Sequence, residues 1–315
     1  MIGQIFKSTG SWYDVYVEDQ KLFYSARLVG KMKLIDDQLT NPVAVGDMVE
    51  IEVQNTEQAT IHKVLPRKNY IARQSPKSRH QVHIIAANID QVILVTTLLD
   101  PVYKPGFIDR FLLTTEPQNI PVIINVNKCD LHVEVEMQQY LELKKSYESI
   151  GYRVHETSTQ NHFGIEDLKI AVRDKVSLFS GQSGVGKSSL LNAIQDDLGL
   201  KTQEISNYSG KGTHTTTFAE MFHLHSSGKI IDTPGIKLLS FNNLEVMDVA
   251  HNFREFFIAS RDCKFGSQCT HRNEPDCSVK TKVNNQELSE ARYLHYITIL
   301  EEIEKQNYWE RSKKY

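Results

Sequence analysis

Residues 181–190 read GQSGVGKSSL and match the pattern G-x-x-x-x-G-K-[ST]. Glycines in this pattern let the backbone bend so that its N–H groups surround a phosphate. The apolar run KVSLFS (175–180) precedes the loop and the helix-like run SSLLNAIQ follows it, which places the loop at the positive end of a helix. The sequence therefore predicts a phosphate-binding loop. Its candidate residues are Gly181, Gln182, Ser183, Gly184, Val185, Gly186, Lys187, Ser188 and Ser189.

Side chains at the end of this loop and further along the sequence indicate a nucleotide bound together with Mg²⁺. Lys187 can reach the β- and γ-phosphates, and the Ser188 hydroxyl can ligate Mg²⁺. Asp232 ends the apolar run KII 45 residues after Lys187, so its carboxylate can hold the same ion through water. In the same DTPG turn, Gly235 can offer its N–H to the γ-phosphate. Taken alone, DTPG is a common turn sequence, and its distance from the phosphate loop favours the nucleotide site.

The loop NYSGKGTHTTT (207–217) lies between these two motifs and combines glycines with hydroxyl side chains. Loops of this kind place a threonine on Mg²⁺ and become ordered when a γ-phosphate is present. Thr215 and Thr216 are the candidate Mg²⁺ ligands, and the sequence does not choose between them.

A second motif, NKCD (127–130), ends the apolar run IPVIINVN. The carboxylate of Asp130 can accept hydrogen bonds from the ring N–H and the exocyclic amine of guanine, a pair of donors that adenine lacks. Asn127 is expected to tie the base to the phosphate loop, and the stem of Lys128 to cover the base. Downstream, the segment ETSTQ (156–160) can offer a backbone N–H to guanine O6, with Ser158 as the candidate residue.

These motifs occur in an unusual order along the chain: base motif, purine loop, phosphate loop, threonine loop and acidic turn. In an ordinary GTPase the phosphate loop comes first and the base motif near the end. A circular permutation explains the order, because a domain whose termini lie close together keeps its sheet when it is cut and rejoined. Alternating buried strands and helices, such as QVILVTTLL (91–99) and EVEMQQYLELKKSYESIG (134–151), predict a doubly wound α/β domain over residues 71–240.

Residues 1–70 have a different texture, with short alternating runs broken by turn formers. In MVEIEV (48–53), the apolar and acidic side chains fall on opposite faces, which is typical of a half-buried strand. Several such runs predict a small β-barrel. An OB-fold barrel is the preferred interpretation, although periodicity alone does not separate it from an SH3-like barrel.

Three of the four cysteines lie within fifteen residues, together with a histidine. In a chain that we expect to be cytosolic, this spacing favours a metal site over disulfides. Three thiolates and one imidazole form a closed tetrahedral set, typical of one structural Zn²⁺, and buried free cysteines are the alternative. We expect this site in a mostly helical domain over residues 241–315, with Cys129 as a packing residue elsewhere. The candidate ligands are Cys263, Cys269, His271 and Cys277.

The formal net charge is −3, so any nucleic-acid surface must be local. No acidic residue occurs between Glu57 and Asp90, and the basic stretch there includes Tyr70, which could stack on a base. A solvated basic linker is the alternative. No apolar run reaches membrane-spanning length, so we expect a cytoplasmic protein. The candidate RNA-binding residues are Lys63, Arg67, Lys68, Arg73, Lys77 and Arg79.

The chain resembles the circularly permuted GTPases of the RsgA (YjeQ) family. The resemblance spans an OB barrel, then NKCD, GQSGVGKSSL, HTTT and DTPG, then a Cys/His cluster. Five residues lie between the first two cysteines, where four are usual. It implies a GTPase that produces GDP and phosphate during late maturation of the small (30S) ribosomal subunit and that is stimulated by this subunit. The implied partners are the subunit and its rRNA, the implied cofactors are Mg²⁺ and one Zn²⁺, and the implied protein is a cytoplasmic monomer that binds no membrane.

Ile236 follows DTPG at the place where many GTPases carry a water-positioning glutamine. An isoleucine cannot orient water by hydrogen bonding, so intrinsic hydrolysis is expected to be slow. His214, beside the threonines, is the candidate catalytic residue, and a solvated or RNA-facing loop histidine is the alternative.

Two other functions are compatible with parts of the sequence. A P-loop ATPase or kinase would use the phosphate loop, but NKCD argues against it. An RNA-binding assembly protein could use GTP only as a structural ligand. Because the acidic turn runs directly into the Cys/His domain, we expect the nucleotide state to move that domain against the barrel.

Overall fold

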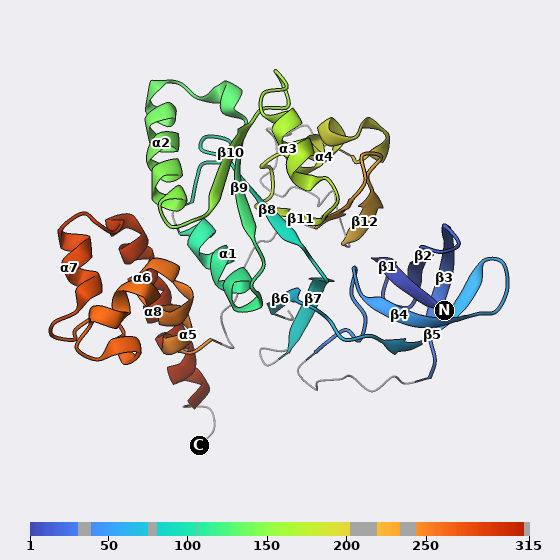
Figure 1. The fold of residues 1–315 in the computed structure, drawn as a ribbon, viewed down its shortest axis with the longest axis horizontal. Coiled ribbons are helices and arrows are strands. Elements are labelled where there is room, and N and C mark those ends of the chain that lie inside the picture. The colour runs from blue at the N-terminus through green and yellow to red at the C-terminus, as the bar shows by residue number, and fades with distance from the viewer. Residues whose placement is uncertain (31–38, 75–80, 105, 202–218, 234–243, 312–315) are drawn as a thin grey trace.

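The computed structural model describes residues 1–30, 39–74, 81–104, 106–201, 219–233 and 244–311, and Figure 1 shows three units that follow one another along the chain. The first unit is a barrel of short strands. The barrel consists of β1 (Ile2–Ser8), β2 (Tyr13–Val17), β3 (Leu22–Leu28), β4 (Met48–Val53) and β5 (Gln58–Val64).

The barrel strands lie in the order β1-β2-β3-β5-β4, and pairing of β4 with β1 closes the barrel. Strands β3 and β5 run parallel, whereas the other barrel pairs are antiparallel. This topology is that of an OB-fold, so it decides the choice against an SH3-like barrel. In β4, Val49 and Ile51 are buried while Glu50 and Glu52 are exposed, as the alternation predicted.

The second unit, called the central domain, is built on a mostly parallel sheet in the order β10-β9-β8-β11-β13-β12. All its neighbouring strands are parallel except the β12–β13 pair. Every residue of β8 and β9 is buried, which explains their continuous apolar sequences. The strands are β8 (Gln91–Thr96), β9 (Val122–Asn127), β10 (Arg153–Thr157), β11 (Val176–Gly181), β12 (Glu220–His223) and β13 (Lys229–Asp232).

Helices cover both faces of this sheet. Val92 and Leu94 of β8 pack in one cluster with α1 (Phe107–Thr115) and α2 (Glu134–Glu148). Ile93 and Val95 point to the other face, where they pack with helices α3 and α4. The predicted doubly wound α/β domain is therefore confirmed. The two helices of the second face are α3 (Ile165–Val172) and α4 (Lys187–Ile194).

A two-stranded ribbon, β6 (Tyr70–Gln74) and β7 (Val82–Ala87), lies between the barrel and the central domain (Figure 1). The third unit, residues 244–311, is helical and is called the C-terminal module. Leu113 of α1 packs within its apolar core, so the module rests on the central domain. The module consists of α5 (Val246–Asn252), α6 (Arg254–Ala259), α7 (Ser278–Asn284) and α8 (Glu290–Arg311).

Short 3-10 helices complete the described structure, at Glu116–Gln118, Cys129–Leu131, Asp196–Leu198, Ser260–Asp262 and Gly266–Gln268. Within the described residues, no helix is both long enough and apolar enough to cross a membrane.

Candidate functional site

The phosphate loop connects the end of β11 to the start of α4. Gly181 and Gly186 adopt φ angles of +153° and +87°. A Cβ at Gly181 would lie 2.2 Å from the carbonyl oxygen of Val95, and one at Gly186 would lie 2.5 Å from Nδ2 of Asn127. Both contacts are closer than any real side chain allows. The loop therefore requires glycine at both positions, because of these positive φ angles and because the Val95 carbonyl and the Asn127 side chain leave no room for a Cβ.

The lysine of this loop is held over the loop itself. Nζ of Lys187 donates to the carbonyl oxygens of Gly181 (3.1 Å) and Gln182 (2.9 Å). Burial lowers the pKa of Lys187 to about 8, against the opposing effect of the Asp232 carboxylate. Phosphate oxygens at this position would favour the charged ammonium, so the loop has the electrostatics of an anion site.

Asp232 ends β13 and lies beside β11, with Phe179 as its register partner. Its side chain is buried next to the phosphate loop. Ser188 is the second residue of α4 and is half-buried. Asp232 thus ends β13, and Ser188 lies at the start of the helix that follows the adjacent parallel strand β11. The other candidates of this half, His214, Thr215, Thr216 and Gly235, lie outside the described residues, as does Ile236.

Asn127 connects the base motif to the phosphate loop. Its Nδ2 donates to the carbonyl oxygen of Val185 at 2.9 Å. Its Oδ1 accepts from the hydroxyl of Thr157 at 3.0 Å, and that hydroxyl accepts from Nδ2 of Asn125 at 2.8 Å. The side chains of Asn125, Asn127 and Thr157, which form this series of hydrogen bonds, are all buried. The ends of β9 and β10 and the phosphate loop are therefore fixed to one another by a single buried network.

Asp130 is exposed, and a neighbouring loop orients its carboxylate. The Ser158 hydroxyl donates to Oδ1 of Asp130 at 2.5 Å and accepts from the N–H of Gln160 at 3.1 Å. The N–H of Ser158 itself donates to the carbonyl oxygen of Phe163 at 3.0 Å. The N–H of Ser158 is therefore already used by the loop, which corrects the expectation that it faces the base, and its hydroxyl orients the carboxylate of Asp130.

Lys128 has a left-handed backbone (φ +64°), and its Nζ lies 2.8 Å from Oδ2 of Asp100. Asp100 follows β8, 28 residues earlier in the chain, and it is a residue of this site that motif reasoning missed. No local pattern could have found it, because the contact exists only after β8 and β9 pair in the sheet. Cys129 is half-buried, and burial raises the pKa of its thiol to about 11, so it behaves as an inert thiol.

The cysteine cluster has the geometry of a tetrahedral metal site. The Sγ atoms of Cys263 and Cys277 are 3.9 Å apart, and Nδ1 of His271 lies 3.8 Å and 3.5 Å from them. Two thiolates on a tetrahedral Zn²⁺ are about 3.8 Å apart, given bonds of about 2.3 Å. With Cys269, all four ligand atoms lie within 4.8 Å of one another, and all four residues are buried. The residues present therefore fit a closed structural metal site.

The surroundings of the cluster hold its ligands in place. Burial lowers the pKa of His271 to about 4, which keeps the imidazole neutral and able to bind a metal. The Glu274 carboxylate accepts from the N–H groups of Thr270 (2.7 Å) and Arg272 (2.8 Å), on either side of His271. The Tyr293 hydroxyl of α8 donates to the carbonyl oxygen of His271 at 2.7 Å. The five-residue spacing between the first two cysteines is accommodated by the 3-10 helix at Gly266–Gln268.

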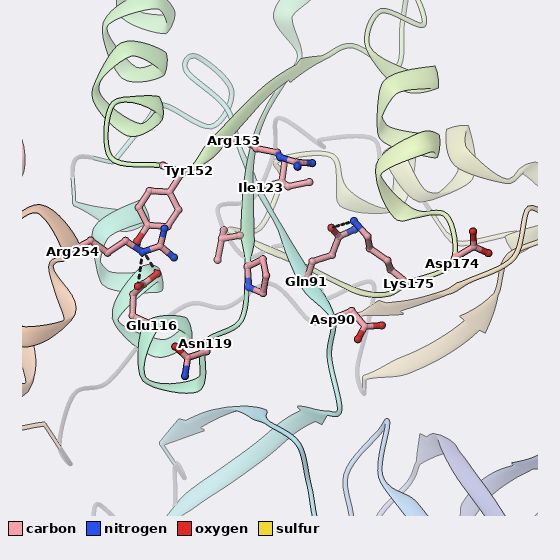
Figure 2. Close-up of a pocket in the computed structure, with 13 residues that line it drawn as sticks. Asp90, Gln91, Glu116, Asn119, Ile123, Tyr152, Arg153, Asp174, Lys175 and Arg254 are labelled. Atoms are coloured by element: carbon pink, nitrogen blue, oxygen red, sulfur yellow. Dashed lines mark hydrogen bonds and ion pairs between the residues drawn. The ribbon is translucent and has the colours of Figure 1, made fainter.

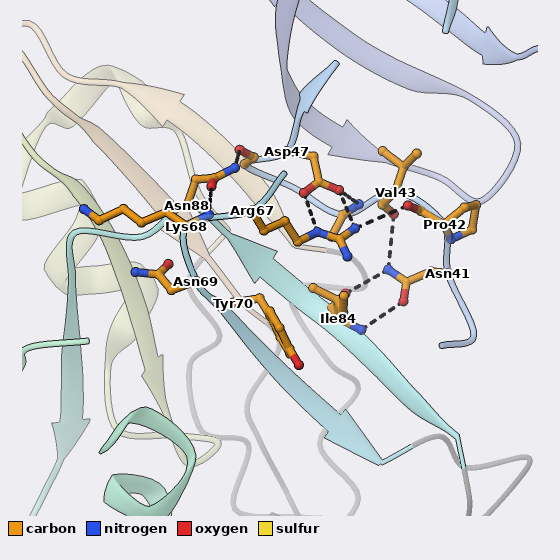
Figure 3. Close-up of polar contacts among 12 residues, drawn as sticks. Asn41, Pro42, Val43, Asp47, Arg67, Lys68, Asn69, Tyr70, Ile84 and Asn88 are labelled. Atoms are coloured by element: carbon orange, nitrogen blue, oxygen red, sulfur yellow. Dashed lines mark hydrogen bonds and ion pairs between the residues drawn. The ribbon is translucent and has the colours of Figure 1, made fainter. Parts of the chain in front are cut away.

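The basic stretch of residues 63–79 is only partly available as a surface. Figure 3 shows Arg67 turned inward, where it donates to both oxygens of the buried Asp47 at 2.7 Å and 2.8 Å. Its side chain is only 12% exposed, so Arg67 is an internal ion-pair partner and is removed from the predicted RNA contacts. Lys63 and Lys68 are exposed beside Glu50 and Asp90. Arg73 is exposed on β6, and Lys77 and Arg79 lie outside the described residues.

A pocket of about 660 Å³ lies at the amino ends of the strands of the central sheet, on the side away from the phosphate loop (Figure 2). It opens at the amino ends of the parallel strands, near Gln91 and Arg153. Arg254 forms one wall, where it donates to Glu116 at 2.6 Å and stacks on the ring of Tyr152. The phosphate loop and the base motif lie at the carboxyl ends of these strands, so this pocket is not the candidate nucleotide site.

Comparisons with known proteins agree with this geometry. The family model described as RsgA GTPase matches residues 64–242, and the RsgA N-terminal domain model matches residues 2–61. A protein of Bacteroides thetaiotaomicron named small ribosomal subunit biogenesis GTPase RsgA 2 is 44% identical over 308 residues, which cover 98% of this chain and 99% of that protein. A Flavobacterium johnsoniae protein named small ribosomal subunit biogenesis GTPase RsgA is 44% identical over 304 residues, covering 96% and 93%.

Two solved structures are similar over nearly the whole chain. The crystal structure of YjeQ from Thermotoga maritima has a TM-score of 0.78 and 34% identity, and the match covers 96% of this chain and 98% of that one. The crystal structure of YloQ, described as a circularly permuted GTPase, has a TM-score of 0.72 and 30% identity, with 97% and 95% covered. Sequence, motif order and fold thus agree, and the chain belongs to the RsgA GTPase family.

Proposed function

We propose that this chain hydrolyses GTP to GDP and phosphate during late maturation of the small ribosomal subunit. The observation that carries the proposal is the hydrogen bond from Asn127 to the phosphate loop at Val185. It makes the base motif and the phosphate loop parts of one site, in spite of their reversed order in the sequence. Family membership supports the same activity, since the curated relatives are named for it.

Guanine recognition is assigned to the base motif. Asp130 accepts from the two donors of guanine, and the Ser158 hydroxyl fixes the rotamer of that carboxylate. Asn127 holds the base loop against the phosphate loop, and the Lys128 stem covers the base. An adenine base would leave the carboxylate unpaired, so the site selects GTP and GDP over ATP.

Phosphate binding is assigned to residues 181–189, with Lys187 on the β- and γ-phosphates. Mg²⁺ supplies positive charge for the phosphate oxygens when bound, and Ser188 and Asp232 would hold it, together with Thr215 or Thr216. Gly235 is proposed to donate its N–H to the γ-phosphate, and His214 to orient the attacking water. These assignments follow the sequence motifs.

The structural metal is proposed to be Zn²⁺, because three thiolates and one imidazole select it over harder cations.

We place the domain boundaries near residues 70 and 240. The partner is proposed to be the rRNA of the small subunit, contacted in part through Lys63, Lys68, Arg73, Lys77 and Arg79. We propose that the protein acts as a monomer in the cytoplasm.

One further function is favoured by a specific feature, the isoleucine at position 236 in place of a water-positioning glutamine. A protein that binds RNA and uses GTP only as a structural ligand would need no such glutamine. GTP turnover by the purified full-length chain, measured with and without purified small subunits, separates the two. We expect slow turnover alone and clear stimulation by subunits, whereas absent turnover with saturating subunits would favour the structural role.

A further inference from the structure

We infer that Asp100 is a positioning residue for guanine nucleotides, acting through Lys128. Its carboxylate holds the ammonium of Lys128, and this contact determines where the lysine stem lies over the base. The inference rests on the proposed function, since it concerns the same nucleotide site. Asp100 belongs to none of the sequence motifs of that site.

The course of the Lys128 side chain supports this role. From a left-handed backbone, the side chain runs along the phosphate loop, and a Cβ at Gly186 would lie 3.9 Å from its Cε. The side chain then ends on Asp100, with Nζ 2.8 Å from Oδ2. The Lys128 side chain is only 23% exposed, and it lies between the base loop and the loop after β8.

The loop that carries Asp100 is itself well fixed. The buried hydroxyl of Thr97 donates to the carbonyl oxygen of Pro101 at 2.7 Å, and the N–H of Tyr103 donates to the carbonyl oxygen of Leu98 at 2.9 Å. Pro101 lies beside the phosphate loop, where a Cβ at Gly184 would be 3.6 Å from its Cδ. The backbone on both sides of Asp100 is therefore held in place, and its carboxylate, 49% exposed as a side chain, contacts Lys128.

This arrangement lowers the entropic cost of binding a base. A lysine has four rotatable side-chain bonds, and ordering it at the moment of binding would reduce affinity. A lysine that is already held by a fixed carboxylate presents its apolar stem in one conformation, which is preorganisation. The carboxylate also balances the charge of the ammonium, so the base meets a nearly neutral surface.

The test is the dissociation rate of a fluorescent GDP analogue from the full-length chain, measured by stopped flow. Asp100→Asn is isosteric and removes the charge, and we expect dissociation to become about twofold to fivefold faster. Asp100→Glu keeps a carboxylate and should dissociate at a rate between those of wild type and Asp100→Asn. Glu166→Gln breaks a similar surface pair, to Lys169 of α3, and should leave the rate unchanged.

The decisive comparison repeats Asp100→Asn in a Lys128→Met background, which keeps an apolar stem but has no ammonium. If Asp100 acts through Lys128, the second substitution adds no further acceleration. Equal acceleration in both backgrounds, or none in the wild-type background, would overturn the inference while leaving the proposed function intact. A wild-type chain that fails to bind the GDP analogue would instead overturn the proposed function, and this inference with it.

Discussion

The central domain joins its two neighbours in different ways. Towards the C-terminal module, the buried guanidinium of Arg292 in α8 forms ion pairs with Asp109 of α1 and, at 2.7 Å, with Glu255 of α6. The hydroxyl of Tyr147 in α2 adds a hydrogen bond of 2.8 Å to Asp109. Four helices from two units thus share one buried polar network.

The joint with the barrel is a short strand edge. Strand β1 pairs with β12 through the register partners Lys7 and Glu220. The side chains of these two residues form an ion pair of 2.9 Å, and each is 35% exposed. Lys229 of β13 adds a hydrogen bond to Gln4 at 2.8 Å. At the same joint, Phe6 and Tyr16 of the barrel pack on His223 of β12.

This difference indicates which parts of the molecule move together. Breaking a buried ion pair leaves an uncompensated charge, whereas an exposed pair contributes little. The C-terminal module and α1 should therefore behave as one body. The barrel instead contacts the hairpin β12–β13, which ends at Asp232 beside the phosphate loop. From the sequence we expect the nucleotide state to move the C-terminal module against the barrel. The weaker contacts at the barrel joint make it the place where we expect this movement to occur.

Removing the metal should have the largest effect on stability. It should loosen the joint with the C-terminal module and leave the barrel unchanged. Structural Zn²⁺ contributes about 10–16 kcal/mol to the folding of small domains. A chelator, or Cys269→Ser, should therefore unfold the C-terminal module. Hydrogen exchange should then increase in α8 and also in α1, while β4 and β5 keep their protection. Unchanged exchange in α1 would show that the buried network does not couple the two units.

Replacing Arg292 should have the next largest effect. Arg292→Met leaves Glu255 buried without its cation and Asp109 with His295 as its remaining ion-pair partner, and we expect a loss of about 3–5 kcal/mol in the free energy of unfolding. Urea denaturation followed by circular dichroism measures it. A loss below about 1 kcal/mol would mean that water reaches the network and that the two joints are alike.

The pH dependence of nucleotide affinity tests the phosphate loop of the central domain, which lies between the two joints. The pKa of Lys187 is lowered to about 8, so its ammonium is charged below that pH and increasingly neutral above it. Phosphate binds the charged form, so the affinity for GDP should be nearly constant up to about pH 7, fall about twofold by pH 8 and approach a fall of about tenfold per unit above pH 9. Lys187→Met should bind weakly and without this dependence. An equal decline in that variant would assign the effect to another group.

Lys7→Met should have the smallest effect, and it is matched to Arg292→Met at the other joint. Its ion pair is exposed, so we expect a change of about 0–1 kcal/mol in the free energy of unfolding. The same urea experiment serves both variants. A loss as large as that of Arg292→Met would contradict the proposed difference between the joints.

Much of this architecture could be predicted from the sequence because its signals are local. Continuous apolar runs marked β8 and β9, and the alternation of residues 48–53 marked a barrel strand. The motifs at 127–130 and 181–188 each lie at the end of a strand, so pairing in a parallel sheet brings them to one edge. The four metal ligands were also visible, because fifteen residues contain all of them.

Other features depend on contacts between distant segments. Arg67 lies in a basic stretch that is typical of an RNA contact. Its guanidinium group instead forms an ion pair with Asp47, twenty residues earlier in the chain. The sequence predicts that Ser158 offers its backbone N–H to the base, yet that N–H donates to the carbonyl oxygen of Phe163 and the Ser158 hydroxyl donates to Asp130. Asp100 had no motif at all. In each case a tertiary partner, absent from the local pattern, determines what the side chain does.

The central claim is that NKCD and the phosphate loop form one guanine nucleotide site, and the nucleotide preference of Asp130→Asn tests it most directly. Xanthine carries an oxygen where guanine carries the exocyclic amine, so an amide at position 130 matches xanthine and a carboxylate matches guanine. Subunit-stimulated turnover of GTP and XTP should be measured for both proteins. We predict that wild type prefers GTP, on the order of 10⁴-fold, and that the variant loses or reverses this preference. An unchanged preference for GTP in the variant would contradict the account.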